Sequence, residues 1–154
     1  MKYSARSLVR GMHLWPPFLG AGIRLRHMSE DFREAEVELR LGRLNRNAVG
    51  TQFGGSLFAM TDPFYAIMLM RNLGREYLVW DRSASIDYVA PGRGTVRARF
   101  ALTGDRLAQI RAQAEGGEKV LPEFDTDIVD AKGEVVARVH RTVYVRLKPR
   151  HRPA

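Results

Sequence analysis

The chain has 154 residues, 45% of them hydrophobic and 27% charged, which fits one globular domain with a sizeable core. It has no cysteine, which excludes disulfides, thiolate nucleophiles and cysteine-based metal sites and agrees with a reducing, cytoplasmic location. The formal net charge of +8 favours a polyanionic partner. Four of those charges, however, come from the basic tail, residues 146–154, so we expect no nucleic-acid partner.

The first 20 residues are predicted to form a helix and a docking segment. The helix covers residues 3–14 and stops at Trp15, because a residue that precedes proline is pushed out of the helical region. Trp15, Phe18 and Leu19 are then expected to dock this segment on the body. The start of the chain has no long apolar region, so it does not read as a standard secretory signal.

Residues 23–41 alternate apolar and charged side chains, the pattern of a β-hairpin with one buried and one exposed face. A turn at residues 29–31 would place Arg24 opposite Glu36. Opposite charges across a strand pair contribute roughly 0.2–1 kcal/mol each. The alternation and the charges therefore favour the same register.

The stretch Gly54–Asn72 is apolar on nearly every side, which is typical of a buried helix. It approaches the length of a membrane span, but Asp62, Pro63 and a pair of glycines argue against one, and we expect none. A carboxylate in an apolar setting is usually paired, neutralised or functional. Pro63 removes a helical hydrogen bond beside it and is expected to bend the helix there. Local rules tend to be broken at functional sites.

A polar loop, residues 43–53, leads into this helix and therefore lies at its N-terminus. The first backbone N–H groups of a helix lack partners and carry partial positive charge. Gly54 and Gly55 would let a ligand approach the backbone closely.

Two further segments, residues 80–89 and 96–102, alternate as strands do. Turn residues between them predict a hairpin in which Arg97 lies opposite Asp87. Residues 105–114 then read as a short amphipathic helix that ends at a glycine pair.

The last third of the chain is predicted to be another hairpin. A tight turn at its Lys-Gly pair would set Asp127 opposite Arg138 and Asp125 opposite His140. One face of the final strand is a row of apolar residues that only Arg141 interrupts.

The predicted element order is helix, two strands, long apolar helix, two strands, short helix, two strands. No repeat or linker divides residues 1–154, so we expect a single domain. Strands with one inward face and a helix that is apolar all round predict an α+β fold. A curved antiparallel β-sheet would wrap around the long central apolar helix.

The sequence FGGSLFAMTD, from Phe53 to Asp62, resembles a pattern found in acyl-CoA thioesterases of the phenylacetate-degradation type. Their pattern is His-Gly-Gly, a bulky run and a Leu-Ala-Asp-like triplet. The segments NAVGTQFGGSLFAMTDPFYAIML and VVARVHRTVYVRLKP are more similar to an uncharacterised family of thioesterase-like proteins, a domain of unknown function. The resemblance covers about residues 14–148 and implies the hotdog fold.

The resemblance implies roles for two residues of the helix. Asp62 falls on the acidic position that serves as nucleophile or general base. Gly55 falls on the glycine whose backbone N–H polarises the thioester carbonyl, as an oxyanion donor does. The family histidine before the glycines is Phe53 here, and either Asn47 or Gln52 could replace it as a hydrogen-bond partner.

Substrate contacts are expected from five residues around this motif: Gln52, Phe53, Gly54, Ser56 and Thr61. Other roles remain open for the same positions. The Asp62 carboxylate could pair across a subunit boundary, the glycines could serve close packing, and the serine could cap the helix. The four histidines have no metal-binding spacing, so we expect neither a metal nor a cofactor.

Two functions are compatible with these residues. The first is hydrolysis of a small acyl thioester of the CoA type. The second is binding of acyl-CoA or an acyl chain without turnover, which the missing histidine would permit. The resemblance also implies a homodimer or a dimer of dimers, while the acyl group and its carrier stay open.

Overall fold

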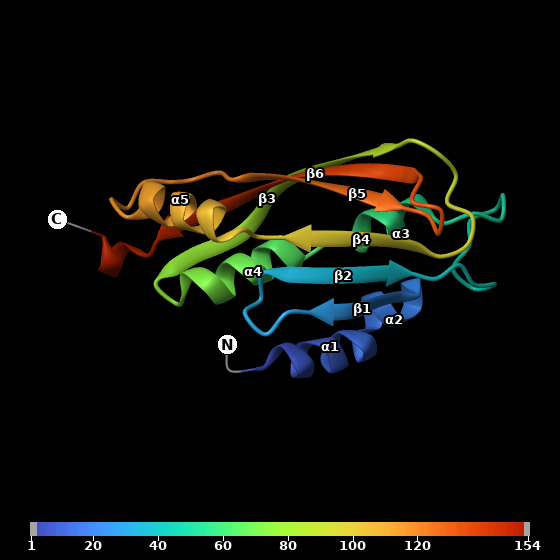
Figure 1. Ribbon diagram of the computed structural model, residues 1–154, viewed down its shortest axis with the longest axis horizontal. Helices are drawn as coiled ribbons and strands as arrows, with labels where there is room; N and C mark the ends of the chain where they lie inside the picture. Colours follow the sequence, from blue (N-terminus) through green and yellow to red (C-terminus); the bar gives the residue numbers. More distant parts are fainter. Residues whose placement is uncertain (1–2, 153–154) are drawn as a thin grey trace.

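The computed structural model describes residues 3–152, which contain five α-helices, six strands and one 3-10 turn (Figure 1). The helices are α1 (Ala5–Leu14), α2 (Pro16–Ala21), α3 (Gly54–Ala59), α4 (Phe64–Leu73) and α5 (Gly104–Ala114), and the 3-10 turn is η1 (Pro149–His151). The strands are β1 (Ile23–Met28), β2 (Glu34–Leu39), β3 (Tyr77–Tyr88), β4 (Val96–Ala101), β5 (Glu123–Val129) and β6 (Val135–Leu147).

The strands form one antiparallel sheet in the order β1-β2-β4-β5-β6-β3. Helices α3 and α4 lie against one face of this curved sheet (Figure 1). The ring of Phe64 packs 5.0 Å from that of Phe100 on β4, and the ring of Tyr65 stacks 4.1 Å from that of Phe124 on β5. The predicted α+β architecture, a curved sheet around an apolar helical segment, is confirmed.

The central helical segment is interrupted, where the sequence suggested one continuous helix. Residues 60–63 separate α3 from α4. Pro63 has no N–H to donate to the carbonyl of Ala59. That carbonyl instead accepts from the N–H of Asp62 at 3.1 Å, which tightens the chain into a turn. Asp62 therefore lies at the break between α3 and α4.

The N-terminal segment covers the free side of β1 (Figure 1). Ser4 caps α1, and a further helix that was not predicted, α2, starts at Pro16, a position that suits proline. Of the three predicted docking residues, Phe18 is buried while Trp15 and Leu19 are exposed.

The predicted register of β1 and β2 is wrong by two residues. Arg24 lies opposite Glu38 rather than Glu36, and a bulge follows Leu25. The turn covers residues 29–33, two more than expected, and within it Phe32 adopts a left-handed backbone conformation with φ of 55°.

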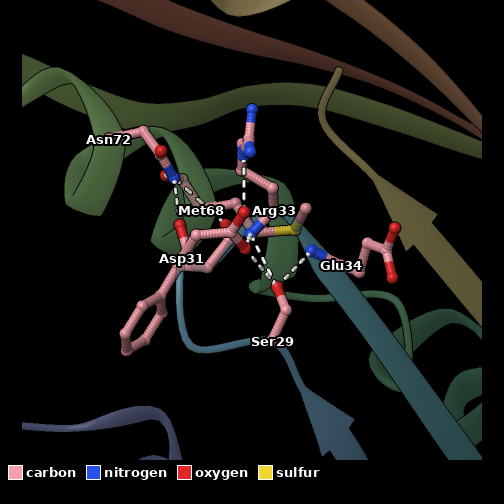
Figure 2. A network of polar contacts seen from close by, with 7 residues as sticks. Ser29, Asp31, Arg33, Glu34, Met68 and Asn72 are labelled. Carbon is pink, nitrogen blue, oxygen red and sulfur yellow. Dashed lines mark hydrogen bonds and ion pairs between the residues drawn. The ribbon is translucent and has the colours of Figure 1, made fainter. Parts of the chain in front are cut away.

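A network of polar contacts fixes this turn (Figure 2). The Ser29 hydroxyl accepts from the backbone N–H groups of Arg33 and Glu34 at 3.0 and 2.8 Å. The Asn72 Nδ2 amide of α4 donates to the carbonyls of Asp31 and Phe32, each at 3.1 Å. The turn is thereby attached to the central helical segment.

The predicted pairing of β3 with β4 is also wrong. Among the described strands, β3 pairs with β6 alone, and β4 lies between β2 and β5. Arg97 therefore faces Glu38 on β2, and Asp87 faces Arg138 on β6.

The predicted register of the last hairpin is confirmed. Asp127 lies opposite Arg138 and Asp125 opposite His140. Residues 105–114 are helical as predicted, within α5. No helix within residues 3–152 has both the length and the apolar character that crossing a membrane requires.

Candidate active site at the interrupted central helix

A cavity of about 590 Å³ opens where the polar loop meets the start of α3. The loop, the first turn of α3 and the residues that follow β3 form its walls. These residues are Asn47, Val49, Thr51, Gln52, Phe53, Gly54, Gly55, Leu57, Tyr88, Val89, Ala90, Pro91 and Gly92. The cavity therefore holds five of the eight residues expected from the sequence.

Asn47 uses its whole side-chain amide inside its own loop. Its oxygen accepts from the N–H groups of Val49 and Thr51 at 3.1 and 3.0 Å. Its nitrogen donates to the Thr51 hydroxyl at 2.9 Å and the Gln52 carbonyl at 3.1 Å. Two donors and two acceptors are thus satisfied, and Asn47 shapes the loop.

Gln52 joins the loop to two distant parts of the chain. Its Nε2 donates to the carbonyls of Leu39 and Gly94 at 3.2 and 2.8 Å. Those two acceptors fix the orientation of the amide. Its Oε1 is buried and has no hydrogen-bond partner within residues 3–152, so one acceptor at the cavity wall is unsatisfied.

Two aromatic side chains lie over the glycine pair. A Cβ atom on Gly54 would come within 2.9 Å of the Tyr88 hydroxyl oxygen, and one on Gly55 would overlap the Phe53 ring. Both rings are more than half exposed. As the first residues of α3, the glycines have N–H groups without a carbonyl one turn earlier in the helix.

The remaining three predicted residues do not line this cavity. Ser56 and Thr61 are buried, and the Thr61 hydroxyl donates to the Phe58 carbonyl at 2.8 Å. The side chain of Asp62 is 54% exposed and its Oδ2 lies 3.4 Å from Nη1 of Arg141. Asp62 therefore lies at the far end of α3 from the glycines.

Sequence reasoning missed three residues of this region: Tyr88, Asp81 and Arg141. Arg141 is buried, and its Nη1 lies 2.7 Å from Oδ2 of Asp81. Burial raises the pKa of Asp81; Arg141 counteracts this, and the charge of Asp62 adds to it. The interruption of the apolar row on β6 by one arginine was the available signal.

The described residues, 3–152, contain no group of three or more His, Asp or Glu side chains placed to hold a metal ion.

Solved structures with this architecture belong to the hotdog class. A Pseudomonas aeruginosa protein of unknown function, described as a probable thioesterase, has 17% identity and a TM-score of 0.82, with 96% of this chain and 99% of that chain covered. A Haemophilus influenzae thioesterase has 14% identity and a TM-score of 0.68, covering 96% and 93%. The PaaI protein of the E. coli phenylacetic acid degradation operon has 19% identity and a TM-score of 0.61, covering 97% and 94%.

The hotdog fold implied by the sequence is thereby confirmed. The family whose pattern matches residues 5–145 is described as domain of unknown function DUF4442, and the chain belongs to it. No curated protein matches the sequence significantly.

Proposed function

We propose that the protein hydrolyses an acyl thioester of the CoA type, with Asp62 as general base or nucleophile and the Gly55 N–H as oxyanion donor. The observation that carries this proposal is the cavity at the glycine pair of a thioesterase-type hotdog fold. The thioesterase descriptions of similar structures support it.

The chemistry requires two groups. The carbonyl oxygen of a thioester gains negative charge when it is attacked, and a fixed N–H at the cavity wall stabilises that charge. The attack requires a carboxylate that removes a proton from water or attacks the carbonyl itself. The Gly55 N–H and the exposed Asp62 carboxylate supply these groups.

Gln52 is the better replacement for the missing histidine. Asn47 has no unused hydrogen-bonding atom, whereas Gln52 keeps an unpaired Oε1 beside the cavity. An acceptor can hold a water molecule or an amide N–H of the substrate, but cannot stabilise an oxyanion. Phe53, Gly54 and the ring of Tyr88 would then contact the acyl part.

A second copy of the chain would complete the site, because Asp62 lies outside the cavity of its own chain. The strand β3 supports pairing, since within residues 3–152 it has β6 on one side and no strand along its other edge. An open edge is a template for a further strand. We propose a homodimer joined along β3, in which Asp62 of one copy serves the cavity of the other.

Acyl-CoA binding without turnover is the alternative. Phe53, with 56% of its surface exposed, stands where the thioesterases carry histidine, and this observation favours the alternative.

Steady-state hydrolysis of an acyl-CoA panel tests the proposal. We expect turnover by the native protein and a loss of about 10²–10⁴-fold in kcat for Asp62→Ala, the usual contribution of a general base. Asp105→Ala, which removes an exposed carboxylate on α5, serves as the control. Binding of acyl-CoA without hydrolysis of any panel member would establish the alternative instead.

A further inference from the structure

Arg141 is a buried cation that reaches the break of the central helical segment from the strand β6. Its side chain is only 5% exposed and lies in the row that faces the helices. Nη1 lies 2.7 Å from Oδ2 of Asp81 and 3.4 Å from Oδ2 of Asp62, and Nη2 donates to the Thr61 hydroxyl at 3.2 Å. One guanidinium thus connects three segments of the chain.

We propose that Arg141, anchored by Asp81, is the positioning residue that sets the orientation of Asp62. This inference rests on the proposed function, in which Asp62 is the reacting carboxylate.

The difference between the two distances defines the roles of the two carboxylates. Asp81, on β3, is the closer partner of Arg141, and because its side chain is only 19% exposed, little water can replace the arginine. Asp62 is the loose partner, and more than half of its side chain remains exposed. A carboxylate held at one oxygen is oriented while the other oxygen is left to act on a substrate.

The guanidinium group suits this task better than an ammonium group would. Its nitrogens lie in a rigid plane and donate in several fixed directions. Nη2 fixes Thr61 while Nη1 contacts Asp62, so both residues at the break are held from β6. The Phe58 ring, whose centroid is 5.8 Å from the guanidinium carbon, covers the cation from the side of α3.

The experiment determines the crystal structures of the variants and measures kcat and KM for an acyl-CoA substrate. We expect the Asp62 side chain of Arg141→Met to leave the orientation that the guanidinium gives it, and kcat to fall at least tenfold with little change in KM. Arg141→Lys should restore only part of the rate, because an ammonium group lacks the rigid plane of donors. Asp81→Asn, which keeps the arginine and so tests the idea if Arg141→Met does not fold, removes the anchoring charge and should also disorder Asp62 and lower kcat.

Arg138→Met is the matched control, because it makes the same replacement on the opposite, exposed face of β6. An Asp62 side chain that keeps its orientation in both Arg141→Met and Asp81→Asn would overturn the inference, whatever the activity. Native protein that hydrolyses no acyl-CoA would instead refute the proposed function, and the crystal structures would still decide whether Arg141 orients Asp62.

Discussion

Gly54 has no room for a side chain as long as Tyr88 lies over it. A Cβ atom there would approach the Tyr88 Oη, Cζ and Cε1 atoms to 2.9, 3.0 and 3.1 Å. The Tyr88 ring is 58% exposed and so can move aside, at the expense of the cavity wall that it forms. An added methyl group should therefore change the shape of the cavity more than it changes the stability of the fold.

We expect Gly54→Ala to lower thioester turnover about tenfold, corresponding to about 1.4 kcal/mol. The free energy of unfolding should change by less than about 1 kcal/mol, because the helix propensity of alanine offsets the displaced ring. In a Tyr88→Ala background the same substitution should have almost no effect on turnover. An equal loss in both backgrounds would show that the ring is not responsible.

His140 is a titrating group on the exposed face of β6. A hydrogen bond with Asp125, whose Oδ1 lies 2.8 Å from the imidazole Nδ1, raises the pKa of His140 above 6.5, and the charges of Asp125 and Glu123 add to this. A raised pKa means that the pair stabilises the fold below about pH 6.5 and that this contribution is lost as the pH rises through the raised value.

Asp125→Asn should lower the His140 pKa toward 6.5, measured by NMR titration. It should also remove the decline in urea midpoint between acidic and alkaline pH. Asp105→Asn changes the net charge equally on α5 and should leave both quantities as they are. A His140 pKa that stays raised in Asp125→Asn would assign the shift to another group.

Some residues of the candidate site belong to a local sequence motif, whereas the roles of others depend on partners far away in the sequence. The glycine pair and Asp62 were expected from one local motif, and of these residues the glycines line the cavity whereas Asp62 does not. The roles of Gln52 and Arg141 depend on partners from elsewhere, such as the carbonyls of Leu39 and Gly94. No local pattern could distinguish Asn47, which is fully bonded, from Gln52, which is not.

At the scale of elements, the registers show why some strand pairings were predictable. Acidic residues stand at every second position of β2, at 34, 36 and 38, so a shift by two preserves the alternation of charges. Arg24 pairs with Glu38 instead of Glu36, and the same physical argument fits both registers. β5 also has acidic residues at every second position, at 123, 125 and 127. Its register with β6 was nevertheless confirmed, although a bulge follows Ile128.

The attachment of the β1–β2 turn to α4 is an element-scale feature with a measurable effect. Asn72 Nδ2 donates to the carbonyls of Asp31 and Phe32 in the turn and to that of Met68 in α4 (Figure 2). Asn72→Ala should lower the free energy of unfolding by about 1–3 kcal/mol, because partly buried carbonyls lose their donor. Denaturant unfolding measures this, with Gln113→Ala on the exposed side of α5 as the control. A loss below about 0.5 kcal/mol would mean that water replaces the amide.

At the scale of the whole molecule, the open edge of β3 is the proposed dimer contact. Ser83 and Ser85 lie in its second half and are exposed. Replacing both with lysine would place like charges on both copies at the contact, which disfavours pairing. Sedimentation should report a dimer for the native chain and a monomer for the double variant. Ala112→Lys with Gln113→Lys adds the same charge on α5 and should stay dimeric; a native monomer would refute the contact.

The covered edge of the sheet at β1 limits how many copies of the chain can join by strand pairing. The α1 helix lies along β1, and its His13 Nε2 is 2.9 Å from the Leu25 carbonyl oxygen. A chain with two free edges could add copies without end and build a filament. With β1 covered by α1, β3 is the one edge of the sheet in residues 3–152 that is left for a strand of another copy. A single contact along β3 therefore occupies this edge in both copies. Larger assemblies would have to form through other surfaces, as stacked pairs and not as a continuous ribbon.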